Sequence, residues 1–344
     1  MADISSELID TEKVSAWIVE RADVEDPLTF ELIAGGRSNM TFTVYDGEIP
    51  KFVLRRPPTG PLLPSAHDMA REYRLMDALS NSHVPVPSMV GLCQDDAVNG
   101  RDFYVMQFVD GIVVRDIDIG SSFSETTRKT MSESLVATLI ALHEVDIDSV
   151  GLGDLAKRTG YIQRQVKRWT GQWQSSRTRD LPIVDAVAEK LMAQMPEPNP
   201  TAIAHGDYRL SNCMVDADGH VVAVLDWELC TLGEPMADLG GLLGYWHDPA
   251  ETDPTGDSET TGLAGFLTQE EIADLYSEGS GVAKDSINYY RAFAQWRLAC
   301  IAEGVYARYL AGQQGDQDED IDLERMNASV GERAERAAQL LGMI

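Results

Sequence analysis

Cysteine is scarce in this sequence, and the four residues present are far apart. Cys93, Cys213, Cys230 and Cys300 form no Cys-x-x-Cys pair anywhere in the 344 residues. This spacing argues against a disulfide framework and against a cysteine-based zinc site, because both need closely patterned thiols. It is typical of free thiols in a reducing compartment.

Positive charge is scarce as well. The chain has 28 Lys and Arg against 56 Asp and Glu, so its formal net charge is −28. Most of such a surface would repel a nucleic-acid backbone or an anionic bilayer. We therefore expect neither nucleic acid nor a membrane among the partners. The acidity itself selects no ligand, because it is compatible with a cationic substrate and with a merely solvated surface.

Long apolar runs are also missing. No stretch approaches the 18 apolar residues of a membrane-spanning helix, and the start of the chain lacks the basic-then-apolar pattern of a signal peptide. We therefore expect a cytoplasmic protein. The chain is 44% hydrophobic and 24% charged, an ordinary globular balance. Its length suggests two domains or one two-lobed unit.

The residue pattern changes along the chain. Residues 29–47 predict two strands around a glycine-rich turn, residues 51–56 a third strand, and residues 102–111 an apolar strand that runs into a turn. Residues 65–79 predict a helix with Ser65 as its cap and Asp68 three residues on.

From about residue 124, helical periodicity takes over. Leu135, Leu139 and Leu142 mark one helix, and the apolar positions between 184 and 195 mark another. We therefore predict an α+β chain, with a small antiparallel β-rich lobe over residues 1–108 and a larger, mainly helical lobe over residues 109–344. A hairpin around Asp218-Gly219 interrupts the helical half.

Polar side chains gather at this hairpin. The segment before it reads HGDYRLSN (205–212), and its second strand reads VVAVLDWE (221–228). Strand pairing is expected to bring Asp226 back beside Asn212, with Asp207 five residues before that asparagine. Carboxylate and amide oxygens are hard ligands that suit Mg²⁺, and one carboxylate is left to act on a hydroxyl.

The pattern H-G-D-x-x-x-x-N followed by a strand that ends D-W-E resembles the aminoglycoside phosphotransferase and choline kinase-like family. It looks most like the phosphotransferase domains that are also found fused to acyl-CoA dehydrogenases. The resemblance implies a bilobal protein-kinase-like fold with a catalytic β-hairpin, and the cofactors ATP and Mg²⁺. It implies that Asp207 is the catalytic base and that Asn212 and Asp226 are the metal ligands.

Two further positions match supporting residues of this family. His205 matches a position that braces the catalytic loop. Asp238 matches an aspartate that supports the site from behind, although a carboxylate at a helix N-terminus is an equally good interpretation.

The nucleotide side has its own pattern. Glu72 shares the apolar face of the 65–79 helix, and a carboxylate directed toward a core needs a cationic partner. In the strand 51–56, Arg55 aligns with the lysine that kinase-like enzymes use, and a guanidinium suits both Glu72 and phosphate. Lys51 and Arg56 are the alternatives.

Two backbone segments complete the predicted ATP site. In the turn at 34–42, Gly35 and Gly36 allow close backbone approach to phosphates, and Ser38 and Asn39 can donate to them; a simple hairpin turn is the alternative. The segment 105–111 resembles the hinge between the lobes. There Met106 would line the pocket, and backbone groups of Gln107 and Val109 would bind adenine.

The acceptor is expected in the helical lobe after residue 240. The candidate residues are Tyr245, Trp246, Asp248, Tyr289, Tyr290, Trp296 and Glu303. The spacing of Tyr289 and Trp296 is also that of a core stripe. The acidic stretch 247–262 is either a solvated lid or an attraction for a polyamine-like sugar.

We therefore predict a small-molecule kinase that transfers the γ-phosphoryl group of ATP to a hydroxyl. The alternative is a non-catalytic regulator of the same fold that binds a nucleotide or metabolite, which the arginine at position 55 suggests. The retained Asp207 argues against this alternative, because a binding protein needs no base.

Overall fold

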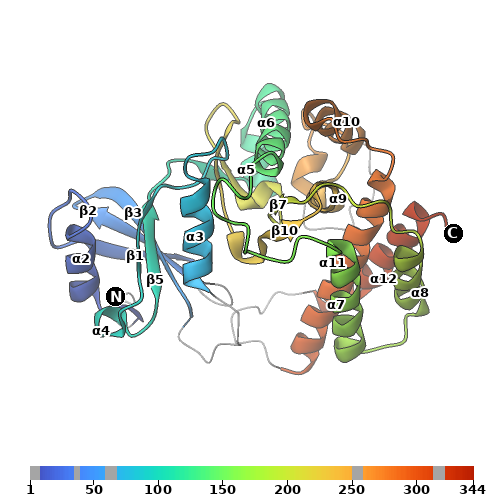
Figure 1. Ribbon diagram of the computed structural model, residues 1–344, viewed down its shortest axis with the longest axis horizontal. Helices are drawn as coiled ribbons and strands as arrows, with labels where there is room; N and C mark the ends of the chain where they lie inside the picture. Colours follow the sequence, from blue (N-terminus) through green and yellow to red (C-terminus); the bar gives the residue numbers. More distant parts are fainter. Residues whose placement is uncertain (1–7, 35–38, 59–67, 250–258, 313–321) are drawn as a thin grey trace. The chain divides into compact units, whose positions relative to one another are not determined.

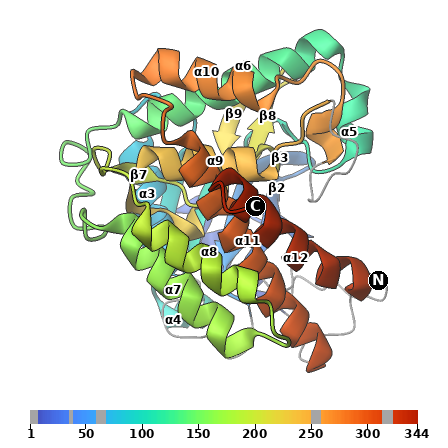
Figure 2. The same ribbon diagram turned by 90° about the vertical axis from the view of Figure 1, so that its right-hand side faces the viewer.

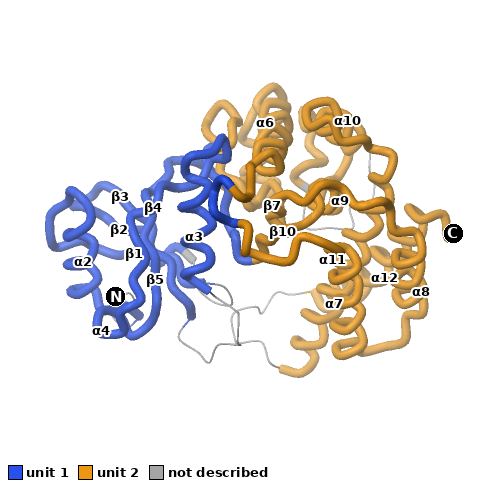
Figure 3. The backbone as a smooth tube through the Cα atoms, in the orientation of Figure 1, with its two compact units in different colours: residues 1–112, 149–152, 222–228 blue, residues 113–148, 153–221, 229–344 orange. Residues whose placement is uncertain are grey.

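A computed structural model describes residues 8–34, 39–58, 68–249, 259–312 and 322–344. The chain forms two compact units (Figure 3). Unit 1 comprises residues 1–112 together with two short returns, 149–152 and 222–228. Unit 2 comprises residues 113–148, 153–221 and 229–344.

Unit 1 is built on a five-stranded antiparallel sheet (Figure 1). Its strand order is β1-β2-β3-β5-β4. The predicted strands at 29–47, 51–56 and 102–111 are thereby confirmed. The strands are β1 (Thr29–Ala34), β2 (Met40–Asp46), β3 (Ile49–Arg56), β4 (Met89–Cys93) and β5 (Phe103–Gln107).

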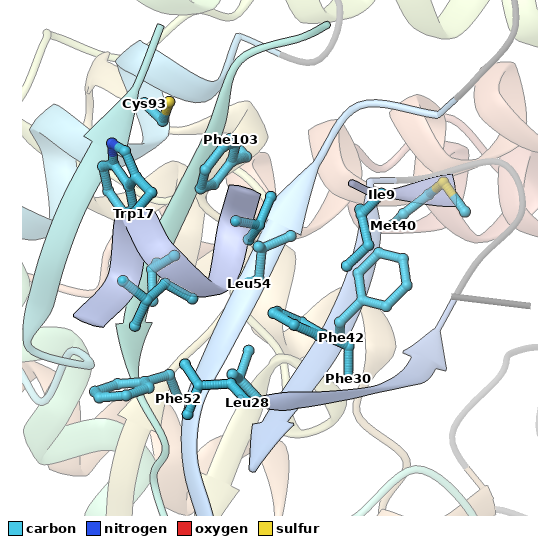
Figure 4. Packing of buried hydrophobic residues seen from close by; sticks show 14 residues of the cluster. Ile9, Trp17, Leu28, Phe30, Met40, Phe42, Phe52, Leu54, Cys93 and Phe103 are labelled. Atoms are coloured by element: carbon cyan, nitrogen blue, oxygen red, sulfur yellow. The ribbon is translucent and has the colours of Figure 1, made fainter. Parts of the chain in front are cut away.

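Side-chain alternation gives this sheet two different faces. Phe42, Leu54 and Phe103 point into a hydrophobic cluster with Trp17 of helix α2 (Thr11–Val19), as Figure 4 shows. Arg55 and Tyr104 directly follow two of these residues, so they lie on the opposite face. That face carries helix α3 (Met69–Leu79), which contacts β4 and β5. Arg55 and Tyr104 are therefore separated from the main core of unit 1.

Helix α3 begins later than the sequence predicts. Its N-cap is Asp68, whose side chain accepts a hydrogen bond from the backbone N–H of Arg71 at 2.9 Å. The predicted cap Ser65 lies outside the described residues. Aspartate is one of the best N-cap residues. The sequence pattern placed Asp68 three residues inside the helix, whereas in the structure Asp68 is the N-cap.

Unit 2 is mainly helical. Helices α7, α8 and α12 contact the long helix α11, and the same helices lie side by side in Figure 2. The predicted helices that contain Leu135 and Val184 are confirmed as α6 and α8. The longer helices are α6 (Glu125–His143), α7 (Tyr161–Ser176), α8 (Pro182–Ala193), α9 (Pro235–Tyr245), α10 (Gln269–Ser280), α11 (Ile287–Leu310) and α12 (Leu323–Leu340).

Short elements position the motif residues. Strands β7 (Ala202–Ala204) and β10 (Thr231–Gly233) pair antiparallel, with Ile203 opposite Leu232. The predicted hairpin turn is confirmed, because the Asp216 N–H donates to the His220 carbonyl at 2.9 Å. The remaining elements are α4 (Asp96–Asn99), β6 (Ile112–Val113), α5 (Ile117–Ser122), β8 (Cys213–Val215) and β9 (Val221–Val224), with single 3-10 turns at Leu210–Asn212, Trp227–Leu229 and Glu259–Gly262.

The four cysteines are buried and free, as their spacing predicts. Within the described ranges, no helix combines the length and the apolar character needed to cross a membrane.

Candidate active site

In unit 2, the loop after β7 brings Asp207 and Asn212 together. The Asn212 amide nitrogen donates to the Asp207 backbone carbonyl at 2.8 Å and to Asp207 Oδ2 at 3.0 Å. A 3-10 turn over Leu210–Asn212 makes this contact possible across five residues. Because the amide nitrogen makes both bonds, Oδ1 is the Asn212 atom left for a metal ion, and such an oxygen fits Mg²⁺.

Asp238 holds this loop from behind. It is 3% exposed and lies in the first turn of α9. Its oxygens accept the backbone N–H groups of His205 at 2.6 Å and Gly206 at 2.9 Å. Both predicted interpretations of Asp238 therefore hold at once, since it occupies a helix N-terminus and also supports the loop.

His205 is fully buried and braces the same loop. Its Nδ1 accepts the Asp207 backbone N–H at 3.3 Å, and its ring meets Tyr208 edge-on. Gly206 takes a φ of +85°, and a Cβ there would lie 2.7 Å from the Leu229 carbonyl oxygen. Only glycine fits this turn, so the backbone requires the glycine of H-G-D.

A chain of polar groups continues behind Asp238. His143 Nε2 lies 3.3 Å from Asp238 Oδ2, and His143 Nδ1 lies 2.7 Å from the Tyr276 hydroxyl. Burial by itself raises the pKa of Asp238. The hydrogen bond and charge of His143, with the charge of His205 and the Gly206 N–H, outweigh burial and hold this pKa below its ordinary value. Asp238 is therefore a stable anion beneath the loop.

In unit 1, Glu72 is the centre of a buried polar cluster. It is 2% exposed. It accepts hydrogen bonds from the Asn39 amide at 2.8 Å and the Tyr104 hydroxyl at 2.9 Å, and Arg55 Nη1 lies 3.3 Å from its Oε2. The prediction that Glu72 pairs with a cation from the strand is confirmed. Asn39 was predicted to donate to phosphate, but its side-chain amide donates to Glu72 instead.

Arg55 also reaches a second carboxylate. Its Nη2 lies 3.8 Å from Asp226 Oδ1, within the part of unit 1 formed by residues 222–228. Burial opposes the Arg55 charge, but Tyr104, Glu72 and Asp226 together raise its pKa. The Arg55 Nε is buried without a hydrogen-bond partner among the described residues. This guanidinium therefore keeps a donor for another ligand.

Asp226 has an unusual backbone. Its φ is +63°, a value that no other non-glycine residue in the described ranges shares. Aspartate tolerates this left-handed region better than most residues, and such strain clusters at functional sites. Asp226 belongs to unit 1 and Asn212 to unit 2, so their convergence on one metal ion stays a prediction. Among described residues, no group of three or more His, Cys, Asp or Glu side chains is placed to hold a metal.

The two alternative cations lie elsewhere. Arg56 points to the other face of β3, where it is buried and donates to the Pro57 and Leu8 carbonyls. Lys51 lies four residues before Arg55, about 13 Å along the strand. It lines a cavity of about 330 Å³ with Met89 and Gln107. Arg55 is therefore the strand cation that pairs with Glu72.

The hinge segment limits how a base could bind. Met106 is buried between Val53 and Met89 in the sheet. The N–H of Gln107 already donates to the Ser88 carbonyl at 2.8 Å. The predicted contribution of Gln107 is thereby limited to its carbonyl. Of the predicted phosphate turn, Gly35, Gly36 and Ser38 lie outside the described residues.

Most of the predicted acceptor residues are buried in unit 2. Trp246, Tyr289 and Trp296 are buried, and each donates to a backbone carbonyl, those of Leu267, Leu191 and Val184 respectively. Tyr289 and Trp296 therefore match the core alternative, and Trp246 is buried as well. Tyr290 and Glu303 are likewise buried, in hydrogen bonds to Glu234 and Thr178.

Asp248 accepts the N–H of Gln269, the first residue of α10, at 2.6 Å. It therefore holds the start of that helix. Tyr245 lines a cavity of about 340 Å³ together with Asn212.

Two arginines beside Asp207 were missed. Arg209 Nε lies 3.5 Å from Asp207 Oδ2, and Arg297 donates to the Gly206 carbonyl at 2.6 Å. Arg209 lies inside the motif, two residues after Asp207, so the sequence alone could have indicated that it lies near the base. Arg297 lies on α11, and no local pattern marks it.

A two-unit α+β chain with this loop has the design of a kinase-like phosphotransferase, and comparison with known proteins agrees. Residues 29–268 match the model of the phosphotransferase enzyme family. A solved structure of a suggested aminoglycoside phosphotransferase from Ralstonia eutropha is 32% identical, with a TM-score of 0.82, covering 97% of this chain and 98% of that one. The predicted bilobal kinase-like fold is confirmed.

The chain belongs to the phosphotransferase enzyme family. It is 35% identical over 301 residues to acyl-CoA dehydrogenase family member 11 of Homo sapiens, covering 86% of this chain and 38% of that protein. The chain spans between 26% and 38% of the length of the curated relatives it matches. A streptomycin–ATP complex of the phosphotransferase APH(2")-IIa shares the fold at 16% identity and a TM-score of 0.56, covering 86% of this chain and 90% of that one.

Proposed function

We propose that this chain transfers the γ-phosphoryl group of ATP to a hydroxyl group of a small molecule, with Mg²⁺ as cofactor. The observation that carries this proposal is the fixed position of Asp207. Asn212 holds its side chain, and Asp238 holds the backbone that precedes it. A carboxylate held in this way suits a base, because general-base catalysis depends on positioning within hydrogen-bond reach of the reacting proton.

Asp207 accepts the proton of the acceptor hydroxyl as its oxygen forms a bond to the γ-phosphorus. The bond from that phosphorus to the β-phosphate oxygen breaks, and ADP leaves. Most of the catalytic effect in such reactions comes from positioning and charge neutralisation. A fixed loop that contains one carboxylate is consistent with this requirement.

Unit 1 holds the nucleotide in this proposal. Arg55 contacts the phosphates, and Glu72 orients its guanidinium. Asn212 Oδ1 and Asp226 are the groups that would hold Mg²⁺, and the ion would neutralise phosphate charge. The adenine base uses the Gln107 carbonyl and the Val109 N–H beside Met106. The ATP-bound relative with the same fold supports a nucleotide here.

A transfer assay with a matched control tests the proposal. The protein is incubated with Mg·ATP and a metabolite extract, and phosphorylated products are identified by mass spectrometry. Asp207→Asn is expected to lower product formation by roughly 10²- to 10⁴-fold, the usual contribution of a general base. Asp218→Asn, at the exposed hairpin turn, is the control and is expected to leave the rate unchanged.

Calorimetry separates this proposal from the non-catalytic alternative. Binding of Mg·ATP without transfer to any extract component would favour a regulator. Equal product from the wild type and Asp207→Asn would contradict the assignment of the base.

A further inference from the structure

A cavity opens beside the proposed base, entirely within unit 2. Its volume is about 340 Å³, and Asn212, Tyr245 and Thr260 contribute to its lining. Asn212 is hydrogen-bonded to Asp207. A ligand in this cavity therefore lies next to the base, where an acceptor hydroxyl is needed.

Two arginines also line this cavity. Arg209 is 30% exposed, its guanidinium carbon lies 4.8 Å from the centre of the Tyr245 ring, and its Nε lies 3.5 Å from Asp207 Oδ2. That Nε is buried and has no hydrogen-bond partner among described residues. Stacked on Tyr245, the guanidinium is held in one orientation with donors to spare.

Arg115 is the second arginine that lines the cavity. It is exposed on the cavity wall and has no ion pair with any described residue. A guanidinium fork matches the paired oxygens of a carboxylate or phosphate, so Arg115 can contact a ligand anion as Arg209 can.

The surroundings of Tyr245 show the same excess of positive charge. Burial, followed by the charge of Asp207, raises the pKa of Tyr245 to about 12, while Arg209, Arg297 and Arg333 act in the opposite direction. Among these charges, one carboxylate and three arginines act on the Tyr245 hydroxyl. A concave site lined by one sign of charge concentrates ligands of the opposite sign.

We infer that the acceptor is an anion, whose carboxylate or phosphate group binds Arg209 and Arg115 while its hydroxyl faces Asp207. This inference rests on the proposed function, and it names the substrate class. A polycationic aminoglycoside would place its ammonium groups against these arginines, and like charges in contact disfavour binding. The stretch 250–258 lies outside the described ranges, and its acidic residues would attract a cation. The test therefore compares anionic with cationic ligands.

Two matched ligand series make that comparison without ATP. Gluconate, glucitol and glucamine share a six-carbon polyol and differ in charge, as do glycerate, glycerol and 2-aminopropane-1,3-diol in a three-carbon series. Binding is measured by ligand-observed NMR. At least one anion is expected to bind about tenfold or more tightly than its cationic counterpart, because charge-assisted bonds to arginine are among the strong ones.

Variants locate the effect. Arg209→Gln and Arg115→Gln are each expected to remove most of the preference for the anion. Arg168→Gln, an exposed arginine on α7, is the control and is expected to keep it. Arg115 is exposed, so its replacement does not endanger folding.

The inference is overturned if neither anion binds more tightly than its neutral counterpart, if neither binds, or if the preference survives in both cavity variants. Phosphorylated cations in the extract assay would also overturn it while leaving the proposed function intact. A preference for anions without Asp207-dependent transfer would keep the anion site and reject the proposed function.

Discussion

Each unit has a buried carboxylate at its part of the candidate site, Glu72 in unit 1 and Asp238 in unit 2, and the two are held by different kinds of partner. In unit 2, Asp238 accepts two backbone N–H groups, which cannot move unless the loop moves. In unit 1, Glu72 is held by the side chains of Asn39, Tyr104 and Arg55. The first arrangement fixes a backbone, whereas the second fixes a cation.

The difference shows which site can respond to a ligand. A side-chain partner can change its contacts by rotating, and Arg55 already lies between Glu72 and Asp226. Asp238 has no such freedom. We therefore expect losses at Asp238 to appear mainly as instability and losses at Glu72 mainly as lost activity.

The largest effect is expected for Asp238→Ala. It leaves two buried N–H groups and His143 without their acceptor, and the free energy of unfolding should fall by about 3–5 kcal/mol. Urea unfolding measures this change. Glu133→Ala, at an exposed pair on α6, is the control and should stay within about 0.5 kcal/mol. A loss below about 1 kcal/mol for Asp238→Ala would remove the contrast between the units.

Glu72→Gln should come next, and should act on the reaction. Without its anionic partner, Arg55 loses its fixed orientation, and misplacement of such a group costs about 100-fold in rate. Steady-state kinetics of phosphoryl transfer would show this fall in kcat/KM, about 2.7 kcal/mol in the barrier. Urea unfolding of the same variant should show a smaller loss than Asp238→Ala; a loss as large would make Glu72 an architectural residue too.

Acid should weaken the contribution of Asp238 by a smaller amount. Its pKa is lowered in the folded protein, so its stabilising effect is complete above the unfolded-state pKa of about 3.9 and is lost as the pH falls through the lower folded value. The unfolding free energies of wild type and Asp238→Asn should differ by a constant amount above about pH 5 and converge below about pH 4. Urea titrations from pH 3 to 7 check this, and a difference that grows in acid would contradict the sign.

Arg55→Lys should have the smallest effect. Lysine keeps the charge facing Glu72 but lacks the fork that also reaches Asp226, so kcat/KM should fall by about three- to tenfold. Arg55→Ala in the same assay sets the scale, and should lose far more. Equal losses in both variants would show that the fork, and not the charge, matters.

Residue patterns predicted much of this site because some constraints are local. Alternation placed the strands of unit 1, and the apolar face of α3 made Glu72 an obvious buried acid in need of a cation. The turn at Gly206 and the contact of Asn212 with Asp207 follow from the order of eight adjacent residues.

Other features depend on distant parts of the chain. Arg297 reaches the loop from α11, ninety-one residues away in sequence. No local sequence pattern predicts the positive φ of Asp226 or the hydrogen bond from Asn39 to Glu72 either. Tyr289 and Trp296 were open between pocket and core because helical spacing is the same for both, and only the packing of α11 decides.

The short return of residues 222–228 to unit 1 has a consequence for the chain as a whole. Arg55 receives Asp226 from a segment that lies between two parts of unit 2 in sequence, and the chain crosses between the units five times. No single cut can therefore release a complete unit 1. A fragment that ends at residue 112 keeps Glu72 and Arg55 but lacks Asp226. Because the segments of the two units alternate along the chain, unit 1 cannot be produced complete as one continuous fragment.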